Sequence, residues 1–343
     1  MRAHAIHSTL ALALLLSSGL ARADTDATLS RVRAAGVLRC GIDQAQAEYS
    51  TSDDHGSLEA FDADLCRAVA VAVLGKNARI RVSDYPDDRA AMQGLNASEV
   101  DLVATLSDDF THTVGTHLQF TRPVLWDGVG FLVPGKSATT NARQLTGKKI
   151  CFLAETSVEE SVRAWFARER LDFVPFPFQE EGEMEAAFAT NNCSALAGDA
   201  TRLAQTRAAL AAHGKRALLL PQRISKDPLA VAVRDDDPQW AALVSWVMEA
   251  LVQAEESGVN QMNVKMRAHS ASDPVLRFLL GSSRQIGPAL GLDDDWVERV
   301  IEATGNYGEI YERDLGSHSP LKLPRGENNL RQRGGQLTAL PPK

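Results

Sequence analysis

The length, composition and charge of the chain limit the functions that it can have. With 343 residues, 44% of them hydrophobic, the chain is long enough to bury a large core and to form two domains. Its 44 acidic residues outnumber its 36 lysines and arginines, which gives a net charge of −8. This balance disfavours nucleic acids and acidic membranes as partners, because both carry negative charge.

The first 23 residues have the pattern of a secretory signal peptide. Arg2 precedes an apolar run over residues 10–16, and residues 21–23 read Ala-Arg-Ala, the small-x-small pattern of a cleavage site. The run is too short to span a bilayer, and no other stretch approaches about 20 apolar residues. No cysteine lies at the cleavage point, which disfavours a lipoprotein. We therefore expect an exported mature chain that begins at Asp24.

Residues 36–73 predict a strand, a polar loop and a helix. The short apolar run over residues 36–41 is closed by glycine, which is typical of a buried strand that ends in a loop. Asp62 fits the N-cap of a helix in which Leu65 and Val69 recur at helical spacing.

Strands and helices continue to alternate along the chain, which predicts an α/β fold. Further strands are expected over residues 79–82, 100–104, 148–153, 173–176, 193–199, 217–220 and 229–233. Helices are expected over residues 89–96, 158–168, 183–190, 200–212 and 240–255. The strand over 173–176 contains a proline and should lie at a sheet edge.

Two segments carry a resemblance to a known family. Residues 37–41 (Val-Leu-Arg-Cys-Gly), followed over 56–70 by Gly-x4-Phe-Asp-x-Asp-Leu-Cys-Arg-Ala-Val-Ala, resemble the first βα unit of periplasmic amino-acid-binding proteins of ABC transporters. This is solute-binding protein family 3, and the resemblance is to its general L-amino-acid branch. Residues 305–310 (Gly-Asn-Tyr-Gly-Glu-Ile) with Glu312 and Arg313 are the most specific match. The resemblance covers nearly all of residues 28–340.

The resemblance implies a type II periplasmic-binding-protein fold. Each lobe would be a mixed sheet flanked by helices, and a two-strand hinge would join the lobes. Lobe 1 would be discontinuous, with residues 24–134 and 233–343 and a helical C-terminal extension, and lobe 2 would hold residues 135–232. The hinge is then expected near residues 134–137 and 227–233.

The four cysteines favour disulfides. Their spacing contains no Cys-x-x-Cys, which disfavours a zinc or thioredoxin-like site, and export favours oxidation. Sequence alone permits three pairings. The two-lobe architecture favours Cys40 with Cys66 and Cys151 with Cys193, because each pair then lies within one lobe.

The resemblance also implies a ligand site between the lobes. An amino acid carries a carboxylate, which needs an arginine or free helix N–H groups, and an ammonium, which needs an acid. Asp199, at the end of a strand, matches the family aspartate that takes the ammonium, although it could instead be a helix N-cap. Thr156 and Ser157 match a threonine pair at a helix start, where they could also only cap. Tyr49 matches the aromatic residue that covers the ligand.

The family arginine that binds the ligand carboxylate is absent from this chain. At that place residues 106–113 read Leu-Ser-Asp-Asp-Phe-Thr-His-Thr, and His112 lies nearest the missing position. A neutral histidine cannot supply the fixed charge of a guanidinium. Glu155 replaces a glycine, and Glu48 replaces a small residue. Four acids change the expected cleft, although each could be a solvated loop residue: Glu48, Asp108, Asp109 and Glu155.

We therefore expect an exported solute-binding protein that captures an amino acid or a cationic amine by hinge closure and delivers it to an ABC transporter permease. We expect a monomer with no cofactor, metal or nucleic acid, and weak binding of zwitterionic amino acids unless Arg122 restores the clamp. Two alternatives stay open. One is a ligand-degenerate sensor or interaction protein, and the other is a dehydratase-like enzyme in which Glu155 and His112 form an acid–base pair. No Gly-x-Ser-x-Gly, His-Glu-x-x-His or phosphate-binding glycine loop is present.

Overall fold

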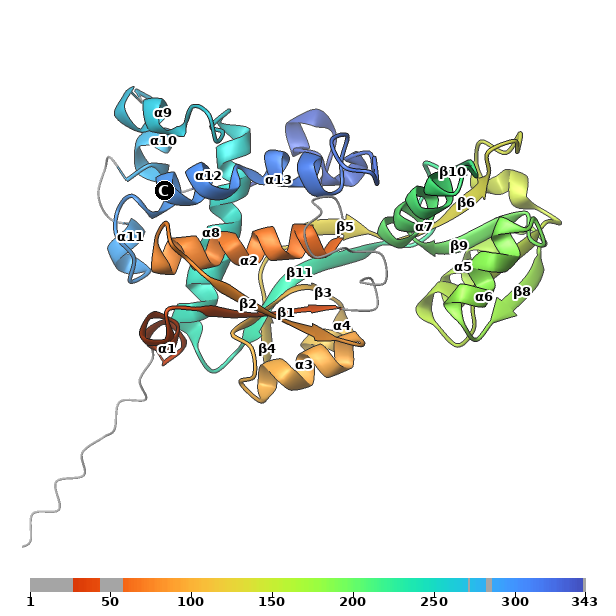
Figure 1. Cartoon of the computed structure of the whole chain (residues 1–343), viewed down its shortest axis with the longest axis horizontal. Helices are drawn as coiled ribbons and strands as arrows, with labels where there is room; N and C mark the ends of the chain where they lie inside the picture. The colour runs from red at the N-terminus through yellow and green to blue at the C-terminus, as the bar shows by residue number, and fades with distance from the viewer. Residues whose placement is uncertain (1–26, 44–57, 271, 282–285, 342–343) are drawn as a thin grey trace, which may run out of the picture.

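The computed structural model describes residues 27–43, 58–270, 272–281 and 286–341. Two mixed β-sheets, each flanked by helices, lie at opposite ends of an elongated molecule (Figure 1). We call each sheet with its helices a lobe. The predicted α/β class and the two-lobe arrangement are confirmed. Within the described residues, no helix is both long and apolar enough to cross a membrane.

The first sheet has the strand order β2-β1-β3-β11-β4, and β5 also pairs with β11. β1 is parallel to β2 and β3, whereas β11 runs antiparallel to β3, β4 and β5. Its strands are β1 (Leu38–Asp43), β2 (Ile80–Tyr85), β3 (Leu102–Ser107), β4 (Leu118–Phe120), β5 (Leu125–Asp127) and β11 (Asp227–Arg234). β3 is an almost continuous buried run, as expected of a strand at the centre of a sheet covered on both faces.

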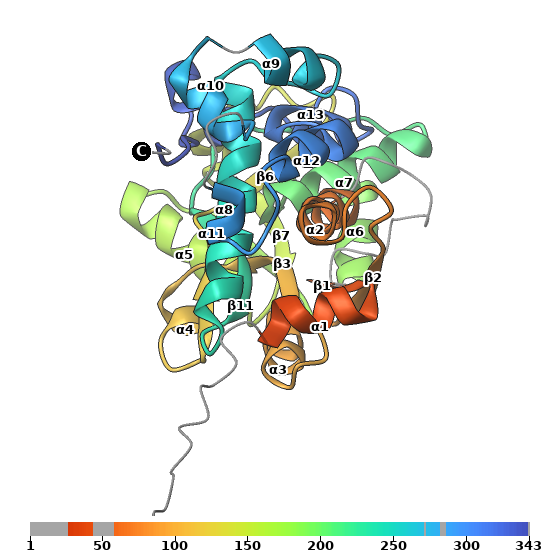
Figure 2. The ribbon, with the colours of Figure 1, turned by 90° about the vertical axis from the view of Figure 1, so that its left-hand side faces the viewer.

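Helices from both ends of the chain cover the first sheet. Figure 2 looks along α2 and shows α12 and α13 above it. The helices are α1 (Ala27–Ala35), α2 (Leu58–Leu74), α3 (Asp88–Asn96), α4 (Phe110–Thr113), α8 (Pro238–Glu256), α9 (Val264–Ser270), α10 (Pro274–Leu279), α11 (Ile286–Ala289), α12 (Trp296–Thr304) and α13 (Tyr307–Asp314). Asp62 lies inside α2, so the predicted N-cap there is wrong. Its buried carboxylate instead accepts a 2.9 Å hydrogen bond from the Thr105 hydroxyl of β3.

The second sheet has the order β10-β6-β9-β7-β8. Its strands are β6 (Val129–Pro134), β7 (Lys149–Leu153), β8 (Val174–Phe178), β9 (Ala195–Asp199) and β10 (Ala217–Leu219), and its helices are α5 (Ser157–Glu169), α6 (Glu181–Ala189) and α7 (Ala200–Ala212). β8, which contains two prolines, lies at the sheet edge as predicted, because there the missing N–H groups leave no ladder bond open.

The chain crosses between the sheets through Gly128. This residue has φ of +147°, and a Cβ there would lie 2.5 Å from the Ser225 carbonyl oxygen of the returning segment. The two crossing segments are bonded to each other, since the Val129 N–H donates to the Ser225 hydroxyl at 2.9 Å. Only glycine fits this close approach.

The predicted first crossing near residues 134–137 is wrong. β6 pairs with β9 and β10 and therefore belongs to the second sheet, although the prediction assigned it to lobe 1. Residues 227–232 lie in β11 of the first sheet, although the prediction assigned them to lobe 2. The crossings lie at residues 127–129 and 225–227.

Two disulfides are present. Cys40 of β1 is bonded to Cys66 of α2, and Cys151 of β7 is bonded to Cys193, just before β9. Each bond joins elements of one lobe, and these are the two pairs that the two-lobe architecture favoured. In the chain-entropy account, loops of this size stabilise the folded chain by about 3.5 to 4 kcal/mol each.

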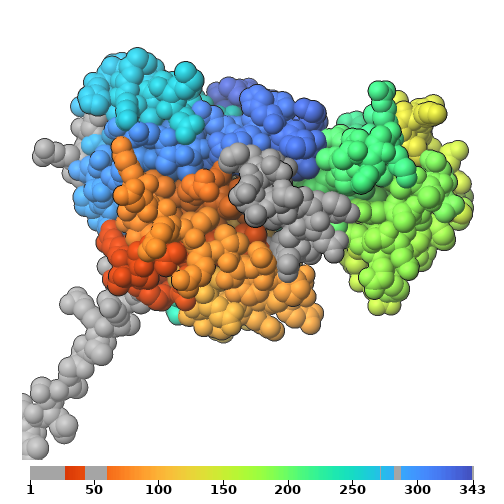
Figure 3. Space-filling model, in the orientation of Figure 1, coloured from red at the N-terminus to blue at the C-terminus, as the bar shows by residue number. Residues whose placement is uncertain are grey.

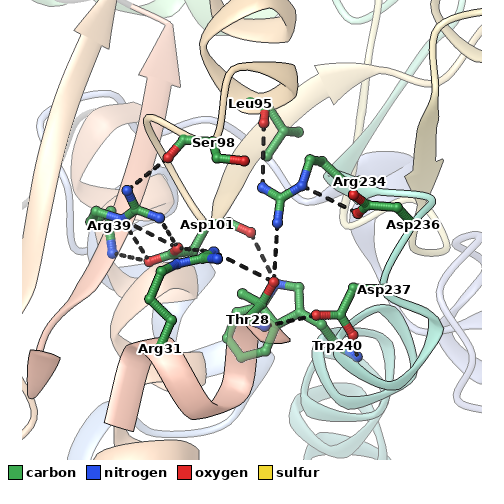
Figure 4. Close-up of polar contacts among 10 residues, drawn as sticks. All are labelled: Thr28, Arg31, Arg39, Leu95, Ser98, Asp101, Arg234, Asp236, Asp237 and Trp240. Carbon is green, nitrogen blue, oxygen red and sulfur yellow. Dashed lines mark hydrogen bonds and ion pairs between the residues drawn. The ribbon is translucent and has the colours of Figure 1, made fainter. Parts of the chain in front are cut away.

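A buried polar network holds elements of the first lobe together, away from the crossing (Figure 4). Asp101 is 1% exposed and accepts hydrogen bonds from the backbone N–H of Arg39 at 2.8 Å and from the guanidinium of Arg31 at 2.9 Å. The Arg39 guanidinium pairs with the same carboxylate at 2.5 Å. The Trp240 indole donates to the Asp101 carbonyl oxygen at 2.9 Å, which ties α8 to β3.

Residues 315–341, which we call the C-terminal segment, reach from the first lobe to the second. Leu323, Leu330 and Leu337 are buried in the core of the first lobe. The Asn328 side chain bonds both the N–H and the carbonyl of Trp126 in β5, at 2.6 and 2.9 Å. The guanidinium of Arg207, on α7 of the second lobe, donates to the carbonyl oxygens of residues 321 and 322.

Candidate functional site

Three aspartates meet where the chain crosses between the lobes. Asp127 ends β5, and Asp227 begins β11 as its direct partner in the ladder. Asp199 ends β9 and is paired with Val129 at the start of β6. The three carboxylates come from distant parts of the sequence. They lie together because these strand ends converge at the crossing.

Asp127 performs the capping role that was considered for Asp199. Its carboxylate accepts hydrogen bonds from the N–H groups of Gly128 (2.8 Å), Ala200 (3.0 Å) and Thr201 (3.2 Å), as well as from the Thr201 hydroxyl. Asp199 occupies the N-cap position of α7, but its side chain makes no capping hydrogen bond. The Asp199 carboxylate is therefore not committed to holding the helix.

The charge of Asp199 is unfavourable in the described structure. Burial raises the pKa of Asp199 to about 7, with further contributions from the negative charges of Asp127, Asp227 and Asp88. Burial likewise raises the pKa of Asp227, and Asp127 and Asp109 add to this. A bound cation would relieve this repulsion, since an opposite charge nearby favours the ionised carboxylate.

Asp108 and Asp109 directly precede α4 in the first lobe, and Asp109 is its N-cap. Burial and the charge of Asp109 raise the pKa of Asp108. Burial alone would raise the pKa of Asp109, but hydrogen bonds from Thr111 and His112 lower it to about 2. Asp109 caps α4 by accepting from the N–H groups of Thr111 (2.8 Å) and His112 (3.0 Å).

His112 does not replace the missing arginine. Its ring nitrogens lie 2.9 Å from Asp109 and 3.5 Å from Asp88, both on the first lobe. Arg122 does not replace it either. Its guanidinium donates to the Thr338 carbonyl oxygen in the C-terminal segment at 2.7 Å and lies 3.6 Å from Glu249.

Glu155, Thr156 and Ser157 form the start of α5 on the second lobe. The Thr156 hydroxyl accepts from the N–H of Glu159, so Thr156 is the N-cap. Glu155 is exposed and has φ of +61°, a left-handed conformation that favours the glycine expected at this position in the family. No hydrogen bond joins this trio to Asp108, Asp109 or His112 in the part of the chain that the structure describes.

A cavity of about 230 Å³ in the second lobe opens beside Asp199. Leu153, Met184 and Leu203 contribute to a mainly apolar lining, and the Arg202 guanidinium in its wall is paired with Glu181 at 2.5 Å. An acid at the rim of an apolar cavity suits a ligand that combines an ammonium with an aliphatic or aromatic part.

The sequence predicted Asp199, Asp108 and Asp109 as ligand residues, but the prediction did not include Asp127 and Asp227. The Trp-Asp-Gly run at 126–128 was a usable signal, because an aspartate followed by glycine marks a turn. Glu48 and Tyr49 lie outside the described residues. Among the residues that are described, no group of three or more His, Cys, Asp or Glu side chains is arranged to hold a metal ion.

Comparisons with known proteins extend over nearly the whole chain, although no protein-family model matches it. The chain is 37% identical over 327 residues to the general L-amino acid-binding periplasmic protein AapJ of Rhizobium johnstonii, an alignment that covers 94% of each protein. It is 33% identical over 342 residues to the glutamate/glutamine/aspartate/asparagine-binding protein BztA of Rhodobacter capsulatus, with 99% of each covered.

A solved structure shares the fold. It is an ABC transporter periplasmic binding protein from Brucella ovis with glutathione bound, 34% identical to this chain with a TM-score of 0.78. The match covers 92% of this chain and 98% of the other. The relatives are binding proteins, and two of the three are described as periplasmic.

Proposed function

Since the chain belongs to the family of amino-acid-binding proteins that serve ABC transporters, we propose that it captures an amino acid or a related cationic amine between its lobes. After cleavage of the signal peptide it would act in the periplasm as a monomer and deliver its ligand to a membrane permease. Binding would involve no chemical turnover of the ligand.

The observation that carries the proposal is the carboxylate of Asp199, which makes no capping hydrogen bond to α7. It stands at the carboxyl end of a strand in an α/β sheet, where such folds hold ligands. Asp127 takes over the capping of α7, and burial with neighbouring acids raises the pKa of Asp199, which disfavours its ionised form in the absence of a cation. A ligand ammonium would supply the missing countercharge.

The arginines near the site bear on which ligand it would prefer. BztA is described as a binder of glutamate, glutamine, aspartate and asparagine, ligands whose carboxylates need cationic partners. Here Arg122 is turned toward the C-terminal segment, and the Arg202 guanidinium is paired with Glu181. We propose that a ligand with net positive charge is preferred over a zwitterion.

A ligand screen tests this function. Thermal unfolding would be followed with common amino acids, diamines, polyamines and small organic acids, because a ligand at 100 times its dissociation constant adds about 2.7 kcal/mol of stability. A shift with a cationic amine or amino acid, with no loss of that compound after long incubation, supports a binding protein. A compound that is consumed supports the dehydratase-like alternative, and no shift with any compound supports the ligand-degenerate alternative.

We predict that the true ligand compacts the molecule. Among the described residues, the lobes are joined by two bonded crossing segments, by the C-terminal segment and by the start of α7, and the second lobe stands apart from the first below the crossing in Figure 3. Rotation about Gly128 would bring Asp199 toward Asp108. Small-angle scattering should show a smaller radius of gyration when a ligand verified by calorimetry is added. An unchanged radius would contradict hinge closure.

A further inference from the structure

A second cavity, of about 360 Å³, lies at the crossing and is bounded by both lobes. One side is formed by α7 and by the connection from β10 to β11, and the other by residues 323–328 of the C-terminal segment. Figure 1 shows α7 extending toward this segment from the second lobe. None of the predicted ligand residues lines this cavity, although Asp127, which caps α7, lies in its wall.

Three arginines line the cavity, and one of them is neutralised. The Arg325 guanidinium donates to the Glu255 carboxylate at 3.0 Å and to the Asn328 carbonyl oxygen at 2.9 Å. It also lies over the rings of Tyr307 and Tyr311, at 5.3 and 4.9 Å from their centroids. Its charge is therefore matched.

The other two, Arg207 and Arg223, have no acidic partner within ion-pair distance among the described residues. Arg207 donates through Nη2 to the carbonyl oxygens of residues 321 and 322. Arg223 donates through Nη1 to the carbonyl oxygens of Leu220 (3.0 Å) and Gln222 (3.4 Å). For both residues, Nε and the second Nη have no partner within the described part of the chain.

Burial and repulsion make these two charges costly. Burial lowers the pKa of Arg207, and the charge of Arg223 lowers it further, so the two guanidinium groups lie close enough to repel each other. Burial also lowers the pKa of Arg223, an effect that the charges of Asp127, Tyr311 and Glu327 partly offset. Desolvated cations are normally retained in proteins beside a counterion.

Two acids in the cavity wall, Asp127 and Glu327, favour the charge of Arg223, but neither forms an ion pair with Arg207 or Arg223 among the described residues. Both carboxylate oxygens of Asp127 accept hydrogen bonds from the start of α7. Glu327 is exposed to solvent, and no ion pair joins it to either arginine within the described residues. The donors that remain form two guanidinium edges, an arrangement that matches an oxyanion.

We propose that this cavity binds a small oxyanion, a sulfate, phosphate or carboxylate, between the guanidinium groups of Arg207 and Arg223. The anion would contact α7 and the β10–β11 connection of the second lobe while facing the C-terminal segment of the first. It would be a second site, distinct from the cleft and opposite to it in charge preference.

The test uses the full mature chain and three probes: sodium sulfate, sodium phosphate and sodium acetate. Melting temperature and calorimetric heats would be measured from 0 to roughly 10 mM of each probe, with sodium chloride holding ionic strength constant so that general salt effects on stability cancel. A saturable rise in melting temperature in the wild type is expected. The three probes distinguish a site for tetrahedral anions from one for carboxylates.

Two variants and one control make the result specific. Arg223→Gln and Arg207→Gln should each weaken anion binding about tenfold or more, because each removes a charge-assisted pair. Arg168→Gln, which removes an exposed arginine of α5, should behave as the wild type. Arg223 bonds only carbonyl groups near it in sequence, so this variant keeps the test valid even if Arg207→Gln fails to fold. The proposal is overturned if the wild type shows no saturable shift or if Arg223→Gln binds as tightly.

Discussion

Replacing Asp101 by alanine is expected to lower the free energy of unfolding by about 3 to 5 kcal/mol, because it leaves a partly buried charge without its partner. Asp101 is 1% exposed and pairs with the guanidinium groups of Arg39 and Arg31. It also accepts the Arg39 backbone N–H, which would lose its acceptor at the same time. Urea denaturation followed by fluorescence would measure the change.

The same network contains a matched control. Asp236 pairs with Arg234 at 3.2 Å, but the Asp236 side chain is 69% exposed (Figure 4). Asp236→Ala should therefore change stability by less than about 1 kcal/mol, as is usual for surface pairs. If the two alanine variants lost similar stability, the buried network would not be what holds α1, β1 and β3 together.

Replacing Asp199 by asparagine is expected to weaken binding of a cationic ligand by about 2 to 5 kcal/mol, or tens to thousands of times in affinity. The reason is that a ligand ammonium would be left without its charged partner in the cleft. Calorimetry of the wild type and the variant with the same ligand would measure the loss. Asp172→Asn removes an exposed acid from the same lobe and should have no effect.

This prediction also has a pH dependence. The pKa of Asp199 is raised to about 7 by burial and neighbouring acids, so a cation must displace a proton below that pH. Affinity should fall as the pH drops below 7, with proton release on binding. For folding the sign is opposite: a raised pKa means that the stability contributed by protonated Asp199 is complete below its unfolded value of 3.8 and is lost as the pH rises to about 7.

The charge of the ligand that binds is the clearest test of the proposed preference for a cation. Micromolar binding of glutamate or leucine, unaffected by Glu155→Gly, would show that the missing arginine is compensated elsewhere. Binding of a diamine that weakens in Asp108→Asn would agree with a cation held from both lobes.

The sequence predicted those parts of the fold that depend on local pattern. The buried strands, the edge position of β8 and the cysteine pairs follow from apolar runs, prolines and lobe membership. The first crossing was misplaced because it was taken from the resemblance to the family, and the apolar run over residues 129–134 does not itself specify which sheet it joins.

The site was less predictable for a related reason. Asp127 caps a helix that begins 73 residues later, a relation that no local pattern contains. Without that contact, the sequence favoured ligand binding for Asp199 but left capping open. The sequence shows that Glu155 stands where the family has a glycine. The structure adds that the backbone at this position is in the left-handed conformation that favours glycine.

The strand order determines which lobe can be completed first as the chain emerges. The second sheet is built from one continuous stretch, residues 129–219, whereas the first needs β11 and the buried leucines of the C-terminal segment. When the chain emerges N-terminus first, β1, β2 and β3 therefore remain without β11 until residue 227 has emerged. During that interval the edge of β3 is unpaired and can associate with other chains, and β11 is the strand that protects it.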